Sequence, residues 1–384
     1  MTVPSVPVLI MAGPGQLRQV REALGARDWT DLELIDGAAA RLEPEQVARV
    51  RSWPGVRLVD DGSLELAPAV DVRPRLETAA PTVRAPELWE LGHTGKGVTV
   101  AVVDTGTTRH RDFSGRLVAF HDCVSGRTEP YDDHGHGTHV TGIVAGDGSD
   151  SKGKHRGIAP ECSVVAIKAF DRHGKARMSD VIKAIQWAVE NRERHGIRVL
   201  NLSAAGRAQL SHQHDPLARA AAAAARHGIL VVAAAGNDGP DPATIGTPAH
   251  SPAVLTVGAS DDRGTVRRDD DRVASLSSRG PTPVDGLTKP DVVAPGVGIT
   301  SAYNGSKGYA TKSGTSMAAP MVAGLAALLL SAHPEADPAA LRGALVGTAE
   351  ELEKGGDANT QGAGLVDGRA ALDRLHKWAR AERG

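Results

Sequence analysis

Short apolar segments alternate with helical segments over most of this 384-residue chain, and this alternation limits the fold more than any other feature. The apolar segments are rich in Val, Ile, Leu and Ala, which is typical of parallel strands buried on both faces. They predict an α/β fold with a doubly wound, mostly parallel sheet, whose functional sites lie at the carboxyl ends of the strands. The predicted strands are Val98–Asp104, Ser163–Phe170, Arg198–Ser203, Ile229–Ala234 and Val254–Ala259.

Two of the helices between these strands have recognisable first residues. Ser179 is the predicted N-cap of a helix over Asp180–Arg194, because a serine side chain can accept a hydrogen bond from the first free N–H groups. Asp215, followed by Pro216, predicts the start of an alanine-rich helix that ends at Gly228.

Residues 1–67 are predicted to form a separate small domain, and residues 68–384 are predicted to form the main domain. The small domain is expected to be ferredoxin-like, with the element order β-α-β-β-α-β. Leu64–Thr82 is rich in proline and alanine and predicts a linker in which the chain is cut. The elements are strands Val6–Met11, Leu32–Ile35, Ala38–Leu42 and Val56–Val59, with helices Gln16–Leu24 and Pro44–Trp53 and a turn at Asp36-Gly37.

Ser316 follows a glycine and a threonine and precedes an apolar segment, Met321–Leu330, that predicts a helix. The first N–H groups of a helix are unpaired and carry partial positive charge, so they stabilise an anion that forms beside the serine. Ser316 is therefore a candidate nucleophile. A simple N-cap motif on a buried helix is the alternative interpretation.

A base and a carboxylate occur in suitable settings upstream of this serine. Asp104 ends the first predicted strand, where an open α/β sheet usually presents its chemistry. His136 lies between two glycines, at a predicted turn before a helix that includes Val140. An acid, a histidine and a serine in these positions predict nucleophilic catalysis.

The chain resembles the subtilases, the subtilisin-like serine proteases. Three segments match family motifs, in the family's order of Asp, His and Ser: Val102–Gly106, His136–Val140 and Gly314–Pro320. The resemblance covers about residues 85–372, and it assigns the triad to Asp104, His136 and Ser316. It leaves His134 and His139 as structural residues. A metal site built from His134, His136 and His139 is the alternative, but no zinc motif accompanies these histidines.

The resemblance also assigns residues to the oxyanion site and the substrate cleft. Asn237 matches the side-chain donor of the oxyanion hole, beside the backbone N–H of Ser316. Ser203, Ala204 and Ala205 match one edge of the cleft, Gly174, Lys175 and Ala176 match the other, and Gly246 matches the floor of the P1 pocket. A substrate is expected to lie between the edges as an added strand. Thr247-Pro248 is expected to be a cis peptide bond.

Neither a metal site nor a cofactor is assigned from the sequence. No cofactor is expected for catalysis. Structural calcium occurs in many subtilases, and Asp112 aligns with a ligand, but Lys152 and Lys154 stand in the loop where oxygen ligands are needed. No calcium site is therefore assigned. This loop and Ser277–Pro283 resemble the bacterial intracellular alkaline subtilases more than the secreted ones.

Composition narrows the remaining function classes. A net charge of −2 favours neither nucleic acid nor an anionic membrane as a partner, and no apolar run is expected to reach the roughly 18 residues of a membrane span. No signal peptide is evident, which favours a cytoplasmic protein, with secretion as the alternative. Cys123 and Cys162 accompany no catalytic motif.

These observations predict a serine endopeptidase that acts on proteins or peptides. Its small domain resembles the inhibitor prodomain of many subtilases, which implies a self-processing zymogen whose own domain is its inhibitor. A small domain that is never removed is the alternative. A pseudoprotease that binds peptides without cutting them is the other alternative for the whole chain.

Overall fold

The computed structural model describes residues 5–25, 28–66, 76–305 and 308–381. Within these residues the main domain has an eight-stranded sheet in the order β13-β12-β11-β10-β6-β8-β7, with β14 also paired to β12. Only β13 runs antiparallel to its neighbour in this described sheet. The mostly parallel α/β sheet was predicted. The strands are β6 (Thr99–Asp104), β7 (Leu117–Asp122), β8 (Ser163–Lys168), β10 (Ile197–Leu202), β11 (Leu230–Ala234), β12 (Leu255–Asp261), β13 (Arg272–Val273) and β14 (Val292–Pro295).

Alternate residues of β6 enter two separate hydrophobic cores, one on each face of the sheet. Val100 and Val102 pack with helices α5 (His136–Ala145) and α9 (Thr315–Ala332). Ala101 and Val103 pack with α6 (Met178–Glu190) and α8 (Pro216–Arg226). Both faces are thus covered, which explains the continuous apolar runs in the sequence. The other elements of this domain are α4 (Ala85–Glu90), α7 (Arg192–His195), β15 (Ile299–Ala302), β16 (Tyr309–Lys312), α10 (Pro338–Gly347), α11 (Ala358–Gln361) and α12 (Gly368–Ala381), with short 3-10 turns at Ser114–Arg116 and Ser149–Ser151.

Helix α6 begins and ends differently from the prediction. Its N-cap is Arg177, not Ser179, and it stops at Glu190 before the separate turn α7. Ser179 does not cap the helix because a carboxylate from the small domain does so. Asp61 accepts hydrogen bonds from the Ser179 N–H (2.8 Å) and hydroxyl (2.7 Å). Asp215, by contrast, caps α8 as predicted, accepting from Leu217 and Ala218.

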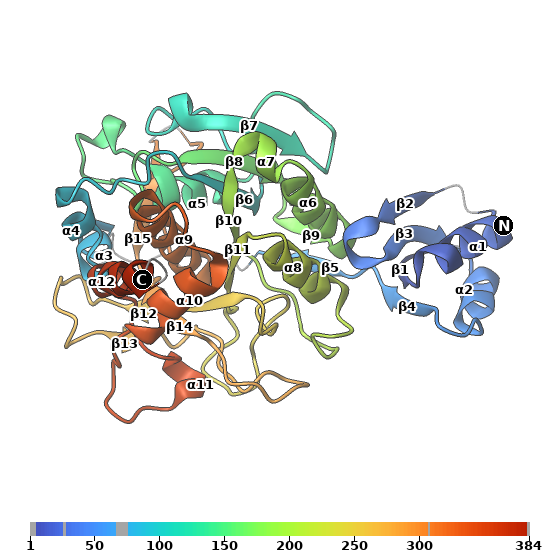
Figure 1. Cartoon of the computed structure of the whole chain (residues 1–384). Coiled ribbons are helices and arrows are strands. Elements are labelled where there is room, and N and C mark those ends of the chain that lie inside the picture. Colours follow the sequence, from blue (N-terminus) through green and yellow to red (C-terminus); the bar gives the residue numbers. More distant parts are fainter. Residues whose placement is uncertain (1–4, 26–27, 67–75, 306–307, 382–384) are drawn as a thin grey trace.

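The small domain lies at one end of the molecule, as Figure 1 shows. Its elements follow the predicted order: β1 (Val6–Met11), α1 (Pro14–Leu24), β2 (Trp29–Leu32), β3 (Gly37–Leu42), α2 (Pro44–Arg51) and β4 (Arg57–Asp60). They form an antiparallel sheet in the order β2-β3-β1-β4. The predicted strand Leu32–Ile35 is wrong, because β2 pairs with β3 over Trp29–Leu32 and Glu33–Ile35 form a 3-10 turn.

Both ends of the segment predicted as a linker belong to secondary-structure elements. Strand β5 (Ser63–Glu65) pairs antiparallel with β9 (Lys175–Arg177) of the main domain. Helix α3 (Leu76–Thr82) packs Ala79 and Ala80 into the main core. Residues 67–75 of this predicted linker lie outside the described residues.

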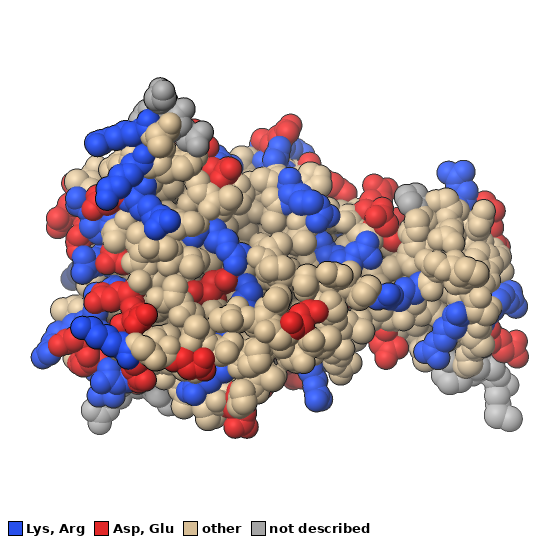
Figure 2. All heavy atoms as spheres, turned by 60° about the horizontal axis from the view of Figure 1, so that its bottom comes forward, with Lys and Arg blue, Asp and Glu red and all other residues tan. Residues whose placement is uncertain are grey.

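Helix α9 is long and apolar enough to cross a membrane by length and composition, with a mean hydropathy of 1.6 over 18 residues. The expectation that no segment reaches this length was therefore wrong. However, 89% of that window is buried inside the protein, as in the core helix of a folded domain. On the face drawn in Figure 2, basic and acidic side chains are interspersed.

Candidate active site

Asp104 and His136 form a buried hydrogen-bonded pair at the carboxyl end of β6. His136 Nδ1 lies 2.7 Å from Asp104 Oδ1, and both side chains are almost fully buried. The carboxylate can only accept, so Nδ1 carries the proton and Nε2 is left as the basic nitrogen. Asp104 Oδ1 also accepts from the Thr105 N–H at 2.7 Å. This pair has the arrangement that a histidine needs in order to act as a general base.

A second aspartate, which the sequence analysis did not single out, organises the loop around His136. Asp132 Oδ1 accepts from the Thr105 hydroxyl and from the Gly135 N–H, while Oδ2 accepts from the Thr138 N–H and hydroxyl. The start of α5 is thus tied to the residue after Asp104. Gly137 is required here, because a Cβ on it would lie 2.1 Å from the carbonyl oxygen of Gly106.

Ser316 lies in the first turn of α9 and makes a reciprocal contact with Ser203. The Ser316 hydroxyl donates to the Ser203 carbonyl (2.9 Å), and the Ser203 hydroxyl donates to the Ser316 carbonyl (2.9 Å). Pro320 explains the second bond, because it has no N–H for the carbonyl four residues earlier. The Ser316 hydroxyl is therefore bonded to Ser203, and no hydrogen bond joins it to His136 in the described part of the chain.

Asn237 is oriented by the residue that precedes the serine. Its side-chain oxygen accepts from the Thr315 N–H (2.9 Å) and the Thr315 hydroxyl (3.0 Å). This assignment of the amide follows from the hydrogen bonds and leaves the NH₂ group as the free end. The amide nitrogen is also the atom nearest to a Cβ built on Gly314 (3.1 Å), so it lies beside the turn that leads to Ser316.

The end of the small domain lies in the predicted substrate cleft. Leu64 pairs with Ala176 and Glu65 with Lys175 in the β5–β9 ladder, and the Leu66 N–H donates to the Gly174 carbonyl at 2.9 Å. Leu66 borders a cavity of about 330 Å³, which is lined by Glu65, Leu66, Ala204, Ala205, Ala234, Gly236, Asn237, Asp238, Thr315 and Ser316. One cavity thus holds the end of the described segment, the candidate nucleophile and the candidate oxyanion donor.

Gly246 does not line this cavity. It packs against Ala205, because a Cβ on Gly246 would lie 2.9 Å from the Cβ of Ala205. It lines a neighbouring cavity of about 720 Å³, and Asp238 borders both cavities. The Thr247-Pro248 peptide bond is cis, as predicted.

The neighbouring histidines differ from His136 in their surroundings. His139 is fully buried, with Nε2 3.0 Å from the carbonyls of Ile299 and Ala310, and burial lowers its pKa to about 3, so it stays neutral. His134 borders the cleft next to Leu66 at Gly174, and burial also lowers its pKa. Burial raises the pKa of the Cys123 and Cys162 thiols to about 12, which removes both as nucleophiles at neutral pH.

One group of side chains in the described part of the chain has metal-ligand spacing, namely His110, Asp112 and Asp150. It does not fit calcium, which prefers six to eight oxygen ligands. Asp112 already accepts from the Tyr309 hydroxyl (2.8 Å) and the Asp150 N–H (2.9 Å), and His110 offers a nitrogen. Arg111 also lies 3.4 Å from Asp150. The protein's own donors thus occupy the carboxylate that aligns with a calcium ligand.

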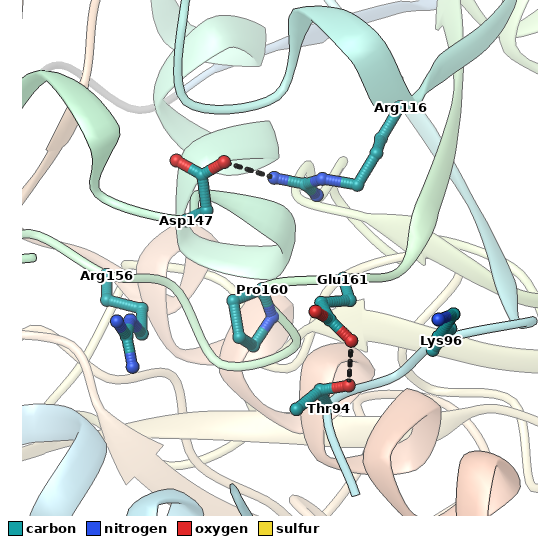
Figure 3. Close-up of a pocket in the computed structure, with 7 residues that line it drawn as sticks. All are labelled: Thr94, Lys96, Arg116, Asp147, Arg156, Pro160 and Glu161. Carbon is teal, nitrogen blue, oxygen red and sulfur yellow. Dashed lines mark hydrogen bonds and ion pairs between the residues drawn. The ribbon is translucent and has the colours of Figure 1, made fainter. Parts of the chain in front are cut away.

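Another cavity, of about 470 Å³, lies beside Asp112, whose carbonyl accepts from the N–H of the lining residue Asp147 at 3.0 Å, and Figure 3 shows its seven lining residues. In this cavity Arg116 lies 3.5 Å from Asp147, and the Thr94 hydroxyl donates to Glu161 at 2.5 Å. No predicted site residue lines it, and it brings no base to a nucleophile. The active-site candidate remains the cleft beside Ser316.

Comparison with known proteins identifies relatives over most of the chain. A model described as the subtilase family matches residues 95–364. Serine protease AprX of Bacillus subtilis (strain 168) is 44% identical over 318 residues, which cover 77% of this chain and 71% of that protein. Subtilisin E of the same organism is 35% identical over 351 residues, covering 90% and 83%. An alkaline protease of Alkalihalobacillus alcalophilus is 34% identical over 341 residues, covering 89% and 80%.

Proposed function

Since this chain belongs to the subtilase family and is a serine-type endopeptidase, we propose that it cuts peptide bonds with Ser316 as nucleophile, His136 as general base and Asp104 as the residue that orients the base. The observation that supports this assignment most directly is the buried 2.7 Å pair of Asp104 and His136, because His136 begins α5 and this helix packs against α9, which carries Ser316.

Each residue has a defined part in the reaction. His136 Nε2 takes the hydroxyl proton as Ser316 Oγ attacks the peptide carbonyl, and it later donates that proton to the leaving amine. Asp104 holds the histidine tautomer and stabilises the imidazolium. The Asn237 NH₂ group and the Ser316 N–H stabilise the negative oxygen of the tetrahedral intermediate. Water then releases the acyl group from Ser316.

The test replaces the nucleophile. Ser316→Ala should reduce kcat by about 10⁶-fold, a magnitude known for subtilisin, and leave circular dichroism unchanged. A labelled fluorophosphonate should modify the wild type at Ser316 only. If the alanine variant kept more than about a hundredth of the activity, another residue would be the nucleophile. The peptide-binding pseudoprotease has no support, because the relatives above carry protease names.

The small domain, residues 1–67, is part of the proposal as a ferredoxin-like inhibitor that is removed by self-processing. Three contacts support this: the β5–β9 ladder, the burial of Leu64 and Leu66 in the cleft, and the Asp61 cap on α6. A strand that fills the cleft prevents a substrate from adding its own. The uncut chain should therefore be weakly active.

Processing is tested by comparing wild type with Ser316→Ala by mass spectrometry. Wild type alone should lose a segment that ends between residues 64 and 76. If both proteins remained full length and the wild type were fully active, the small domain would be a permanent module. This outcome would leave the proposed triad intact, since activity and labelling at Ser316 are measured separately.

A further inference from the structure

Lys168, at the end of β8, is a buried charge that lies next to the candidate active site. Its side chain is 1% exposed, and in the parallel ladder it is the direct partner of Asp104. Its ammonium group donates three hydrogen bonds: to the Thr105 carbonyl (2.7 Å), to Asp133 Oδ1 (2.6 Å) and to the Phe170 carbonyl (2.8 Å). All three of its protons are thus used.

The three acceptors belong to three separate parts of the site. Thr105 follows Asp104. Asp133 precedes His136 by three residues, in the loop that leads into α5. Phe170 leads into the turn before β9, where Asp171 and Gly174 are hydrogen-bonded to each other and Asp171 to Lys175.

The same junction is also fixed through the backbone of Asp104. Its carbonyl accepts from the N–H groups of Ala169 (2.9 Å) and Phe170 (3.2 Å). The side chain of Lys168 adds a second connection, since its ammonium group donates to the carbonyl of Thr105, which follows Asp104, and to the carbonyl of Phe170, whose N–H donates to Asp104. Burying a charge is costly unless it is paired and fully hydrogen-bonded, and here both conditions are met.

We propose that Lys168 is a positioning residue of the peptidase reaction. Its three hydrogen bonds hold the loop after Asp104, the loop before His136 and the turn before the substrate-binding edge β9 in fixed positions relative to one another. This inference rests on the proposed roles of Asp104 and His136. A displacement of about 1 Å at such a site can reduce the rate on the order of 100-fold. Loss of Lys168 should therefore affect both the reactivity of Ser316 and the binding of the substrate backbone.

The test uses Lys168→Met, which keeps the length of the side chain and removes its charge and donors. Lys289→Met is the matched control. Lys289 is 2% exposed and likewise binds a carbonyl (Val254, 2.8 Å) and a carboxylate (Asp291, 2.7 Å), but at the amino ends of β12 and β14. Asp133→Asn is a milder second variant, because Asp133 is 41% exposed and its replacement keeps the shape.

Each full chain is assayed with a peptide substrate, and kcat is calculated per site labelled by a fluorophosphonate. Lys168→Met should lower kcat per labelled site by about 10- to 100-fold, slow the labelling of Ser316 and raise KM several-fold. Asp133→Asn should shift all three quantities in the same directions by less. Lys289→Met should lower only the melting temperature.

Two results would overturn the inference. One is a Lys168→Met protein whose kcat per labelled site, labelling rate and KM stay within about twofold of wild type. The other is an equal kinetic loss in Lys289→Met, which would make the effect a general loss of stability. If Lys168→Met does not fold, Asp133→Asn decides alone, and unchanged kinetics there count against the inference. Failure of the proposed function is seen separately, as a wild type that is not labelled at Ser316.

Discussion

Asp271 is fully buried, and neither of its carboxylate oxygens has a hydrogen-bond partner among the described residues. Burial is the main reason that its pKa is raised to about 7 from the ordinary 3.8, and the charges of Asp262 and Asp270 raise it further, with Arg268 opposing them. We therefore expect Asp271→Asn, which keeps the shape of the protonated acid, to stabilise the protein in neutral and alkaline solution.

The sign and size follow from proton linkage. Between about pH 4 and pH 7 the folded protein holds a proton on Asp271 that the unfolded chain has lost, so this residue makes stability fall as the pH rises. A shift from 3.8 to about 7 corresponds to about 4 kcal/mol of unfolding free energy, which is fully lost above pH 7. With about 2.1 cal/mol/K of unfolding entropy per residue over 384 residues, this is about 5 °C in melting temperature.

The assay compares melting temperatures from pH 4 to pH 9, with Ser316→Ala in every protein to prevent self-digestion. Asp271→Asn should match its parent near pH 4 and exceed it by about 5 °C at pH 8. Asp269→Asn is the control, because that carboxylate lies two residues away and is 69% exposed. A gain that does not depend on pH, no gain at pH 8, or an equal gain in the control would refute the reasoning.

Three other outcomes are expected. Asn237→Leu should lower kcat by about 10²- to 10³-fold with little change in KM, and a loss mainly in KM would contradict its role at the oxyanion. A peptide library should show medium to large apolar P1 residues and some Lys because of Asp238, whereas strict P1 Asp or Glu would exclude this pocket. Asp61→Asn should speed fluorophosphonate labelling of the uncut chain about fivefold, because the lost cap on α6 is worth about 1 kcal/mol. Asp60→Asn is the control and should not change the labelling rate, since the Asp60 side chain is exposed. Equal labelling rates in the two variants would mean that the cap does not hold the small domain in the cleft.

The parts of the molecule that local sequence specifies could be predicted. The five core strands lie within one or two residues of their expected bounds, because each is an apolar run buried on both faces. Asp104, His136 and Ser316 stood out since each has a strand end or helix start and glycines beside it. Their proximity could be expected only from the parallel sheet, which brings strand ends to one edge.

The parts that depend on distant partners could not be predicted. Strand β5 has three residues and is a strand only because β9 pairs with it. Ser179 has the composition of an N-cap, but Asp61, 118 residues away in sequence, supplies the carboxylate. Lys168 reads as an ordinary lysine at the end of a strand, and nothing in its neighbours indicates that three loops meet on its ammonium group.

Helix α9 joins the candidate nucleophile directly to the buried core of the domain. All residues from Thr315 to Leu330 are buried, and the helix packs against β10, β11 and β12 in the middle of one core. Amides in such a segment exchange with solvent deuterium only when most of the domain opens, whereas surface loops exchange through local fluctuations. We therefore expect the backbone that carries Ser316 to keep its place as long as the domain remains folded, and loss of activity on heating to coincide with global unfolding.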